Sequence, residues 1–168
     1  MAKDFFIADT HFGGENIRRY ENRPFANVTE MDEKLIENWN HVVAEDDTVY
    51  VLGDFSDYAD AKQEAGILGR LNGTKILVMG NHDTQRTPKE WRDLGFAECY
   101  PMPVIYKNFF MLSHEPLYIN SNMPYANFYG HVHMNPSYKD ASRQSVCVSV
   151  ERINYMPVEF SVLRAQMM

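Results

Sequence analysis

The chain has 168 residues, of which 45% are hydrophobic and 23% charged, and its formal net charge at pH 7 is −7. This length predicts one globular domain over residues 1–168 that folds around its own core without a disulfide or a structural metal. The acidic balance argues against broad binding to nucleic acids or anionic membranes, which requires a basic face. A phosphate substrate stays compatible with it, because bound metal ions supply local positive charge.

The first half of the chain alternates predicted strands and helices. Apolar runs predict strands at residues 5–8, 48–52 and 75–79. Helices are expected from a cap at Thr29 to about residue 44, at 59–71, and at 88–94 with Gly95 as its stop. Residues 15–27 are polar and end near Pro24, which predicts a loop. The alternation favours parallel strands with helices packed on them.

The second half of the chain is predicted to be mostly β. Residues 102–106 and 109–112 flank Lys107 and Asn108, which predicts a hairpin. Further strands are expected at residues 125–129, 146–150 and 158–162. No apolar run approaches the roughly 18–20 residues of a membrane span. Because the N-terminus carries no secretory pattern, we expect a cytoplasmic protein with free thiols at Cys99 and Cys147.

Potential metal ligands follow five of the predicted strands. They are Asp9 and His11, then Asp54, then Asn81 and His82, then His114, and finally His131 and His133. Ligand sites gather outside the carboxyl ends of parallel strands, so we expect these side chains to converge. A single histidine after a strand is more often structural, but five such histidines beside glycine, carboxylate or amide groups indicate a metal site.

The donor set predicts two ions. Imidazole mixed with carboxylate and amide oxygen suits Mn, Fe, Co, Ni or Zn, and we expect Mn first. Seven side chains are too many for one ion and suit two ions that share a carboxylate, for which we choose Asp54. The candidate ligands are Asp9, His11, Asp54, Asn81, His114, His131 and His133.

The stretch Gly80-Asn81-His82-Asp83 separates into different tasks. Gly80 is expected to allow the turn, and Asn81 to bind one ion. His82 points elsewhere on a tight loop and is expected to protonate the leaving oxygen as a general acid. Two interpretations of Asp83 stay open, namely that it orients a neighbour or that it caps the following turn.

Five motifs stand in a fixed order: Asp9-Thr10-His11, Gly53-Asp54, Gly80-Asn81-His82-Asp83, His114 and Gly130-His131-Val132-His133. From about residue 4 to about residue 163, the chain resembles the calcineurin-like metallophosphoesterases of the compact, uncapped bacterial or phage type. The resemblance implies a single-domain α/β fold, a two-sheet α/β/β/α sandwich. It also implies one metal on Asp9, His11, Asp54 and His133, and a second on Asp54, Asn81, His114 and His131. By the same resemblance Asp57 would pair with His82, although a solvated loop residue or a helix cap fits Asp57 equally well.

The predicted function is therefore a dinuclear metal-dependent phosphoesterase in which a metal-bridged hydroxide attacks phosphorus. No segment is long enough for a cap domain, so the site would accept varied phosphomonoesters or phosphodiesters. The resemblance to compact members of the family, which often act on small phosphodiesters, implies such substrates here, while the oligomeric state stays open. A nuclease or RNA-end phosphodiesterase is an alternative that needs a basic strip, for which the sequence offers only Arg18, Arg19 and Arg23. Of these, we expect the first two to be ordinary surface, whereas Arg23 is either a phosphate contact or a packing corner.

A pyrophosphatase and an inactive scaffold are the remaining hypotheses. A nucleoside-diphosphate-sugar or lipid pyrophosphatase would usually carry an added substrate-binding insertion. A catalytically silent scaffold of the same fold would typically have lost metal ligands or the histidine that follows Asn81. Every motif residue is present here, which favours the enzyme.

Overall fold

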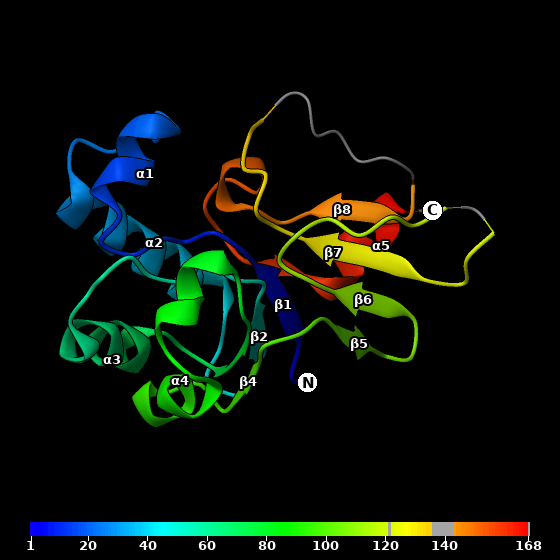
Figure 1. Cartoon of the computed structure of the whole chain (residues 1–168), viewed down its shortest axis with the longest axis horizontal. Coiled ribbons are helices and arrows are strands. Elements are labelled where there is room, and N and C mark those ends of the chain that lie inside the picture. The colour runs from blue at the N-terminus through cyan, green and yellow to red at the C-terminus, as the bar shows by residue number, and fades with distance from the viewer. Residues whose placement is uncertain (121, 136–142, 168) are drawn as a thin grey trace.

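The computed structural model describes residues 1–120, 122–135 and 143–167 (Figure 1). Its strands form two sheets. The first contains β1 (Asp4–Ile7), β2 (Thr48–Val51), β3 (Thr74–Val78), β4 (Glu98–Tyr100) and β9 (Val158–Glu159), in the order β4-β3-β2-β1-β9. The second contains β5 (Val104–Tyr106), β6 (Phe110–Leu112), β7 (Ala126–Tyr129) and β8 (Ser145–Cys147), in the order β5-β6-β7-β8.

The pairing within the sheets brings many strand ends to one place. Strands β1 to β4 are mutually parallel, and so are β6, β7 and β8, whereas β9 and β5 run antiparallel to their neighbours. A parallel bridge between Ala8 and Ser149 joins the end of β1 to the chain just after β8. The carboxyl ends of the parallel strands in both sheets therefore meet, which is where ligand sites form in such folds.

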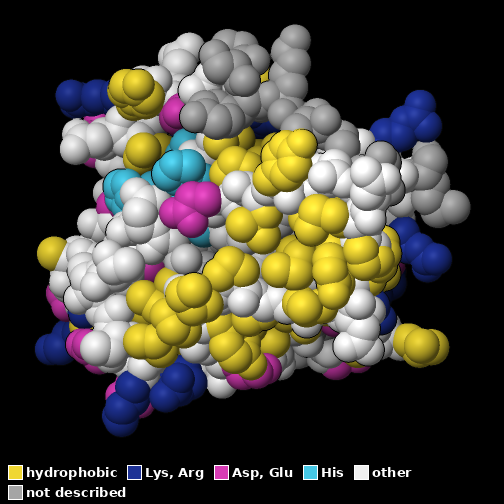
Figure 2. Space-filling view, turned by 45° about the vertical axis from the view of Figure 1, so that its right-hand side comes forward, with side chains coloured by type: hydrophobic (Ala, Val, Ile, Leu, Met, Phe, Trp, Pro, Cys, Tyr) yellow, Lys and Arg dark blue, Asp and Glu magenta, His cyan; other side chains and the backbone are white. Residues whose placement is uncertain are grey.

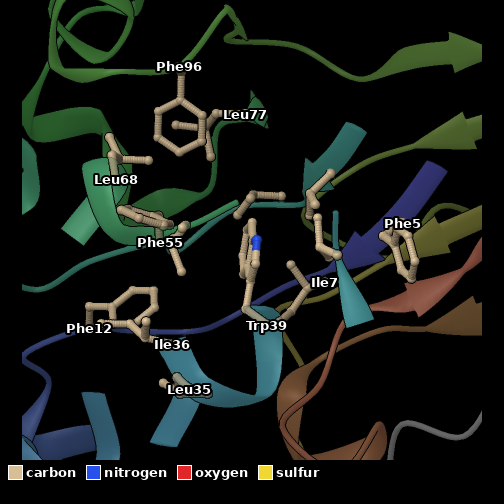
Figure 3. Close-up of a cluster of buried hydrophobic side chains, with 14 of the residues drawn as sticks. Phe5, Ile7, Phe12, Leu35, Ile36, Trp39, Phe55, Leu68, Leu77 and Phe96 are labelled. Atoms are coloured by element: carbon tan, nitrogen blue, oxygen red, sulfur yellow. The ribbon is translucent and has the colours of Figure 1, made fainter. Parts of the chain in front are cut away.

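Most of the helices flank the first sheet. The helices are α1 (Glu15–Tyr20), α2 (Val28–Val42), α3 (Ala61–Arg70), α4 (Pro88–Leu94) and α5 (Phe160–Gln166), with 3₁₀ helices at Asn81–Gln85 and Val150–Arg152. Side chains alternate between the two faces of a strand, so Phe5 and Ile7 of β1 face the helices. There they share a buried cluster with Trp39 of α2 and Leu68 of α3 (Figure 3).

The opposite face of the first sheet packs on the second sheet. Phe6 is fully buried, and its ring lies 5.1 Å from that of Phe128 on β7 in an edge-to-face contact. Leu163 of α5 belongs to the same buried cluster. The predicted two-sheet α/β sandwich is thus confirmed. Among the described helices, none has the length and apolar character that a bilayer crossing would need.

Several local predictions need correction. Residues 15–20 form a helix rather than a loop, because Glu15 forms ion pairs with Arg18 and Arg19 along its surface. The expected strand at 158–162 shortens to β9, and α5 begins at Phe160. The cap of α2 is Asn27, whose side chain accepts from Glu30 N at 2.8 Å, and not Thr29. Strand β4 was not anticipated.

Candidate metal centre

The structure brings all seven predicted ligands together at the meeting point of the strand ends. Three of them lie after β1 and β7 and form the first half of the centre. His11 Nε2 and His133 Nε2 each lie 3.9 Å from Asp9 Oδ1. The three side chains are buried. Ligands about 2.0–2.2 Å from one ion are separated from each other by distances of this order.

The second half lies after β3, β6 and β7. His114 Nε2 is 2.9 Å from Asn81 Oδ1 and 3.0 Å from His131 Nδ1. Asn81 and His131 are exposed, so this half opens to solvent. Figure 2 shows histidine side chains gathered at one place on the surface.

Asp54 stands between the two halves. Its Oδ2 lies 3.5 Å from His11 Nε2 and 3.3 Å from His114 Nε2. Its other oxygen, Oδ1, accepts a hydrogen bond from His82 N at 2.9 Å. One carboxylate oxygen is therefore held by the protein, and the other faces both groups of donor atoms.

Hydrogen bonds on the far side of the ligands fix their orientation. Asp9 Oδ2 accepts from Ser149 Oγ at 2.5 Å and from His131 N at 2.8 Å, which directs Oδ1 into the centre. His114 Nδ1 lies 2.9 Å from the carbonyl of Leu52, so Nε2 points inward. Partners of this kind set the tautomer and the angle of metal-binding imidazoles.

The backbone at the centre is strained. Five of the seven predicted ligands have φ values between 47° and 72°: Asp9, His11, Asp54, His131 and His133. Non-glycine residues rarely adopt this left-handed region, and each such residue costs on the order of 1–3 kcal/mol. The chain therefore holds these side chains in place at the expense of folding stability, which is common at functional sites.

Two glycines give the ligands room. A Cβ at Gly80 would collide with Asp54 Oδ1 and would lie 2.8 Å from His114 Nδ1. Its φ of −100° is accessible to any residue, so Gly80 is required for close approach and not, as expected, to allow a turn. At Gly53 both factors apply, because φ is 92° and a Cβ would collide with His114 Nδ1.

Neighbouring charges and hydrogen bonds shift the pKa values of ionisable groups in the centre. Burial opposes ionisation of Asp54, but the hydrogen bond to His114 and the nearby histidines lower its pKa to about 2. Burial likewise opposes the charged form of His114, yet the hydrogen bond to Asp54 and the negative charge of Asp9 raise its pKa to about 9. These buried carboxylates thus require positive charge beside them, which protons or cations supply.

The residues fit a metal site by a further test. Asp9 Oδ1 and His11 Nε2 are buried, and neither has a hydrogen-bond partner. A buried polar atom without a partner is costly, so both atoms would gain from a ligand. Two groups that have the proximity needed to hold an ion are Asp9, His11 and His133, and Asp54, His114 and His131.

His82 and Asp57 lie at the rim. His82 Nδ1 is 3.1 Å from Asp57 Oδ1, and His11 Nδ1 is 3.1 Å from both oxygens of the same carboxylate. Burial would raise the pKa of Asp57, but its bonds to these two histidines lower it. Asp57 is placed beside His82, as the family resemblance implied, and it also orients His11.

Asp83 lies beneath the centre, fully buried. Its Oδ2 accepts from Asp54 N at 2.7 Å and from Gly80 N at 2.8 Å, while Oδ1 accepts from Phe55 N at 3.1 Å. Burial and the charge of Asp54 raise the pKa of Asp83 to about 6, although the hydrogen bonds from these amides act to lower it. Both interpretations left open for Asp83 are thus realised, because it caps the 3₁₀ turn and anchors the backbone of Asp54.

The chain after β8 contributes residues that the sequence analysis missed. Glu151 Oε2 lies 2.8 Å from His133 Nδ1 and raises the pKa of that histidine against the effect of burial. Arg23 Nε donates to the same oxygen at 3.0 Å, and Arg23 Nη2 donates to the carbonyl of Asp9. The guanidinium is fully buried, so Arg23 supports the ligand loops and does not contact substrate. Ser149 and Glu151 also follow an apolar strand, the same signal that identified the other ligands.

Comparisons with known proteins agree with this geometry. The family model described as calcineurin-like phosphoesterase matches residues 5–161. The chain is 38% identical over 170 residues to the uncharacterized protein MJ1445 of Methanocaldococcus jannaschii, covering 97% of this chain and 90% of that protein. It is 36% identical over 86 residues to the gene 66 protein of Mycobacterium phage L5, covering 49% of this chain and 41% of that protein.

A solved structure supports the fold. The crystal structure of AQ665 from Aquifex aeolicus, titled a protein of unknown function, is similar with a TM-score of 0.77 and 29% identity. The match covers 98% of this chain and 99% of that one. Together with the family model, which spans nearly the whole chain, the converging strand ends give the assignment: the chain belongs to the calcineurin-like phosphoesterase family.

Proposed function

We propose that the protein hydrolyses small phosphate esters, phosphodiesters above all, with two divalent transition-metal ions. The observation that carries the proposal is the position of Asp54 Oδ2, within 3.5 Å of donor nitrogens from both halves of the centre. An oxygen so placed is suited to be shared by two ions. The mixed nitrogen and oxygen donors match Mn, Fe, Co, Ni or Zn, and we expect Mn²⁺ to give the highest activity.

Each ion would have four protein ligands. One set is Asp9, His11, Asp54 and His133, and the other is Asp54, Asn81, His114 and His131. When bound, the ions supply an activated water and neutralise the charge that develops on the phosphoryl oxygens. The water oxygen forms a bond to phosphorus, and the bond between phosphorus and the departing oxygen breaks.

His82 acts on the leaving side. Its Nδ1 lies 3.1 Å from Asp57 Oδ1 and would donate to this carboxylate, so the protonated ring, an imidazolium, would carry its second proton on Nε2. From there the proton passes to the departing oxygen, so the alcohol leaves uncharged. Asp57 keeps the ring oriented for this transfer.

Two features support small diesters over nucleic acid. Asn81, His82 and His131 are exposed, so the centre admits substrates of varied shape. Arg18 and Arg19, which a nuclease would need for backbone contacts, both pair with Glu15. Arg18 Nη1 also donates to the carbonyl of Phe25.

The test compares leaving groups on the Mn²⁺-loaded protein. We expect His82→Ala to slow hydrolysis of alkyl phosphodiesters by about 10²–10⁴-fold, the usual contribution of a general acid. The rate of hydrolysis of nitrophenyl esters should fall far less in this variant, because nitrophenolate leaves without a proton. His41→Ala is the matched control, since His41 is exposed on α2, away from the strand-end motifs. Equal losses for both ester classes would remove the acid role of His82, and no turnover of any ester by the native protein would contradict the proposed function.

A further inference from the structure

A pocket of about 460 Å³ adjoins the metal centre on the side of His82. Its walls come from the start of α1 and from the 3₁₀ helix after β3. The side chains that matter below are Glu15, Asn16, Ile17, Asp57, His82 and Gln85. This volume is at the lower end of the range for small-molecule sites and accommodates a group such as one sugar or aryl ring.

The pocket offers uncharged hydrogen-bonding groups. Asn16 and Gln85 both line the pocket and are exposed, and neither carboxamide has a hydrogen-bond partner in the described part of the chain. Each carboxamide provides two donors and one acceptor oxygen. Ile17 adds an apolar surface to the lining. Such a lining suits a polar ring that bears hydroxyl or amide groups.

The charges around the pocket disfavour an anionic group. Glu15 and Asp57 line it, and the carboxylate of Glu15 is paired with Arg18 and Arg19. The nearby cations are occupied, since Arg18 donates to Glu15 through Nε at 2.9 Å and Nη2 at 2.6 Å. Arg86, next to Gln85, donates through Nε to the buried Glu64 at 2.6 Å. A second phosphate or a carboxylate placed here would lie near the Asp57 carboxylate and would find no unpaired guanidinium among the described residues around the pocket.

We propose that this pocket, the leaving-group pocket, binds the departing alcohol of the substrate and selects an uncharged, hydrogen-bonding ring such as a sugar. The inference rests on the proposed function, in which His82 faces the departing oxygen. It names Asn16 and Gln85 as the residues that recognise this part of the substrate. An ester whose departing group is itself a phosphate, as in a pyrophosphate linkage, is disfavoured.

The test uses two probes whose leaving rings carry substituents of similar size, one an uncharged amide and the other a carboxylate. These are methyl 4-carbamoylphenyl phosphate and methyl 4-carboxyphenyl phosphate, assayed with the full chain loaded with Zn²⁺. Each rate is divided by the rate of the same ester with hydroxide alone, so that the unequal acidity of the two phenols cancels. We expect kcat/KM to favour the carbamoyl ester by about tenfold or more, the effect of one or two hydrogen bonds together with like-charge repulsion. Equal values, or a preference for the carboxylate, would overturn the proposal.

Variants test whether Asn16 and Gln85 are responsible for the preference for the carbamoyl ester. The double variant Asn16→Ala with Gln85→Ala should lower the ratio of kcat/KM between the carbamoyl and carboxylate esters severalfold. The part of the ratio that remains would come from charge repulsion alone. Gln85→Lys should raise kcat/KM for the carboxylate ester by about tenfold, because it places a cation in the leaving-group pocket. Gln63→Ala, an exposed carboxamide on α3 outside this pocket, is the matched control and should keep the native ratio. Unchanged ratios in the pocket variants would contradict the assignment.

A binding measurement separates this inference from the proposed function. Addition of 4-hydroxybenzamide to the Zn²⁺-loaded protein should shift the side-chain amide resonances of Asn16 and Gln85, whereas 4-hydroxybenzoate at the same concentration should not. Shifts without turnover of any ester would support the leaving-group pocket and contradict the phosphoesterase activity. Turnover of both esters at equal rates, without shifts of these resonances, would support the phosphoesterase activity and contradict the leaving-group pocket.

Discussion

Asp54→Asn should empty both halves of the metal centre at once. Asparagine keeps the shape of the side chain and tolerates the left-handed backbone at this position, where φ is 52°. It also retains an oxygen to accept from His82 N. What it loses is the negative charge of the oxygen that lies between His11 and His114. We therefore expect metal content to fall from about two ions per chain to less than one, with a loss of activity of about 10³-fold or more.

The measurement is elemental analysis after dialysis against a metal buffer, alongside the hydrolysis rate. Asp60→Asn is the matched control, because Asp60 caps α3 at the surface and asparagine caps a helix equally well. Thermal unfolding of the metal-free variants checks that the fold survives. Two ions retained by Asp54→Asn would exclude Asp54 as the shared ligand.

Asp83→Ala should destabilise the protein more than any ordinary surface change. Three buried amides, those of Asp54, Phe55 and Gly80, would lose their acceptor. A buried donor left unpaired costs about 1–3 kcal/mol, so we expect the free energy of unfolding to fall by about 3–5 kcal/mol. The raised pKa of Asp83 shows that burying its charge carries a cost, but the alanine variant recovers only part of it.

Urea unfolding of the metal-free protein measures this effect. Asp60→Ala, which removes an exposed helix cap, should cost only about 1 kcal/mol. Asp83→Asn keeps one acceptor oxygen, so its loss in the free energy of unfolding should lie between those of Asp83→Ala and Asp60→Ala. This variant allows the comparison even if the alanine variant does not fold. A loss for Asp83→Ala no greater than that for Asp60→Ala would show that the carboxylate does not anchor the Asp54 backbone.

The sequence was most informative where chemistry repeats along the chain. Asp9, Asp54, Asn81, His114 and His131 each stand just after an apolar run, and parallel strands bring such positions to one edge. This logic holds for both sheets, so it located ligands on β6 and β7 as well as on β1 to β3. The hairpin at Lys107 and Asn108 was equally accessible, and both residues have positive φ values in an antiparallel connection.

The support around the ligands was not accessible in the same way. Ser149 meets Asp9, and Glu151 meets His133, because the chain after β8 pairs with the end of β1 across 140 positions of sequence. No local pattern predicts which strand becomes that neighbour. Arg23 was ambiguous because a buried arginine beside carbonyl groups and a phosphate-binding arginine look alike until burial is known. Gly80 was predicted to allow a turn because the sequence does not reveal that the side chains of Asp54 and His114 approach its backbone closely.

We propose that two ions at this centre act together on a phosphate ester. The most direct measurement adds Mn²⁺ stepwise to metal-stripped protein, well above the dissociation constant, while following hydrolysis of bis(4-nitrophenyl) phosphate. We predict that the rate keeps rising until two equivalents are bound and then levels off, in line with two ions that share Asp54. Full activity at one equivalent, or no turnover with both sites filled, would contradict the account.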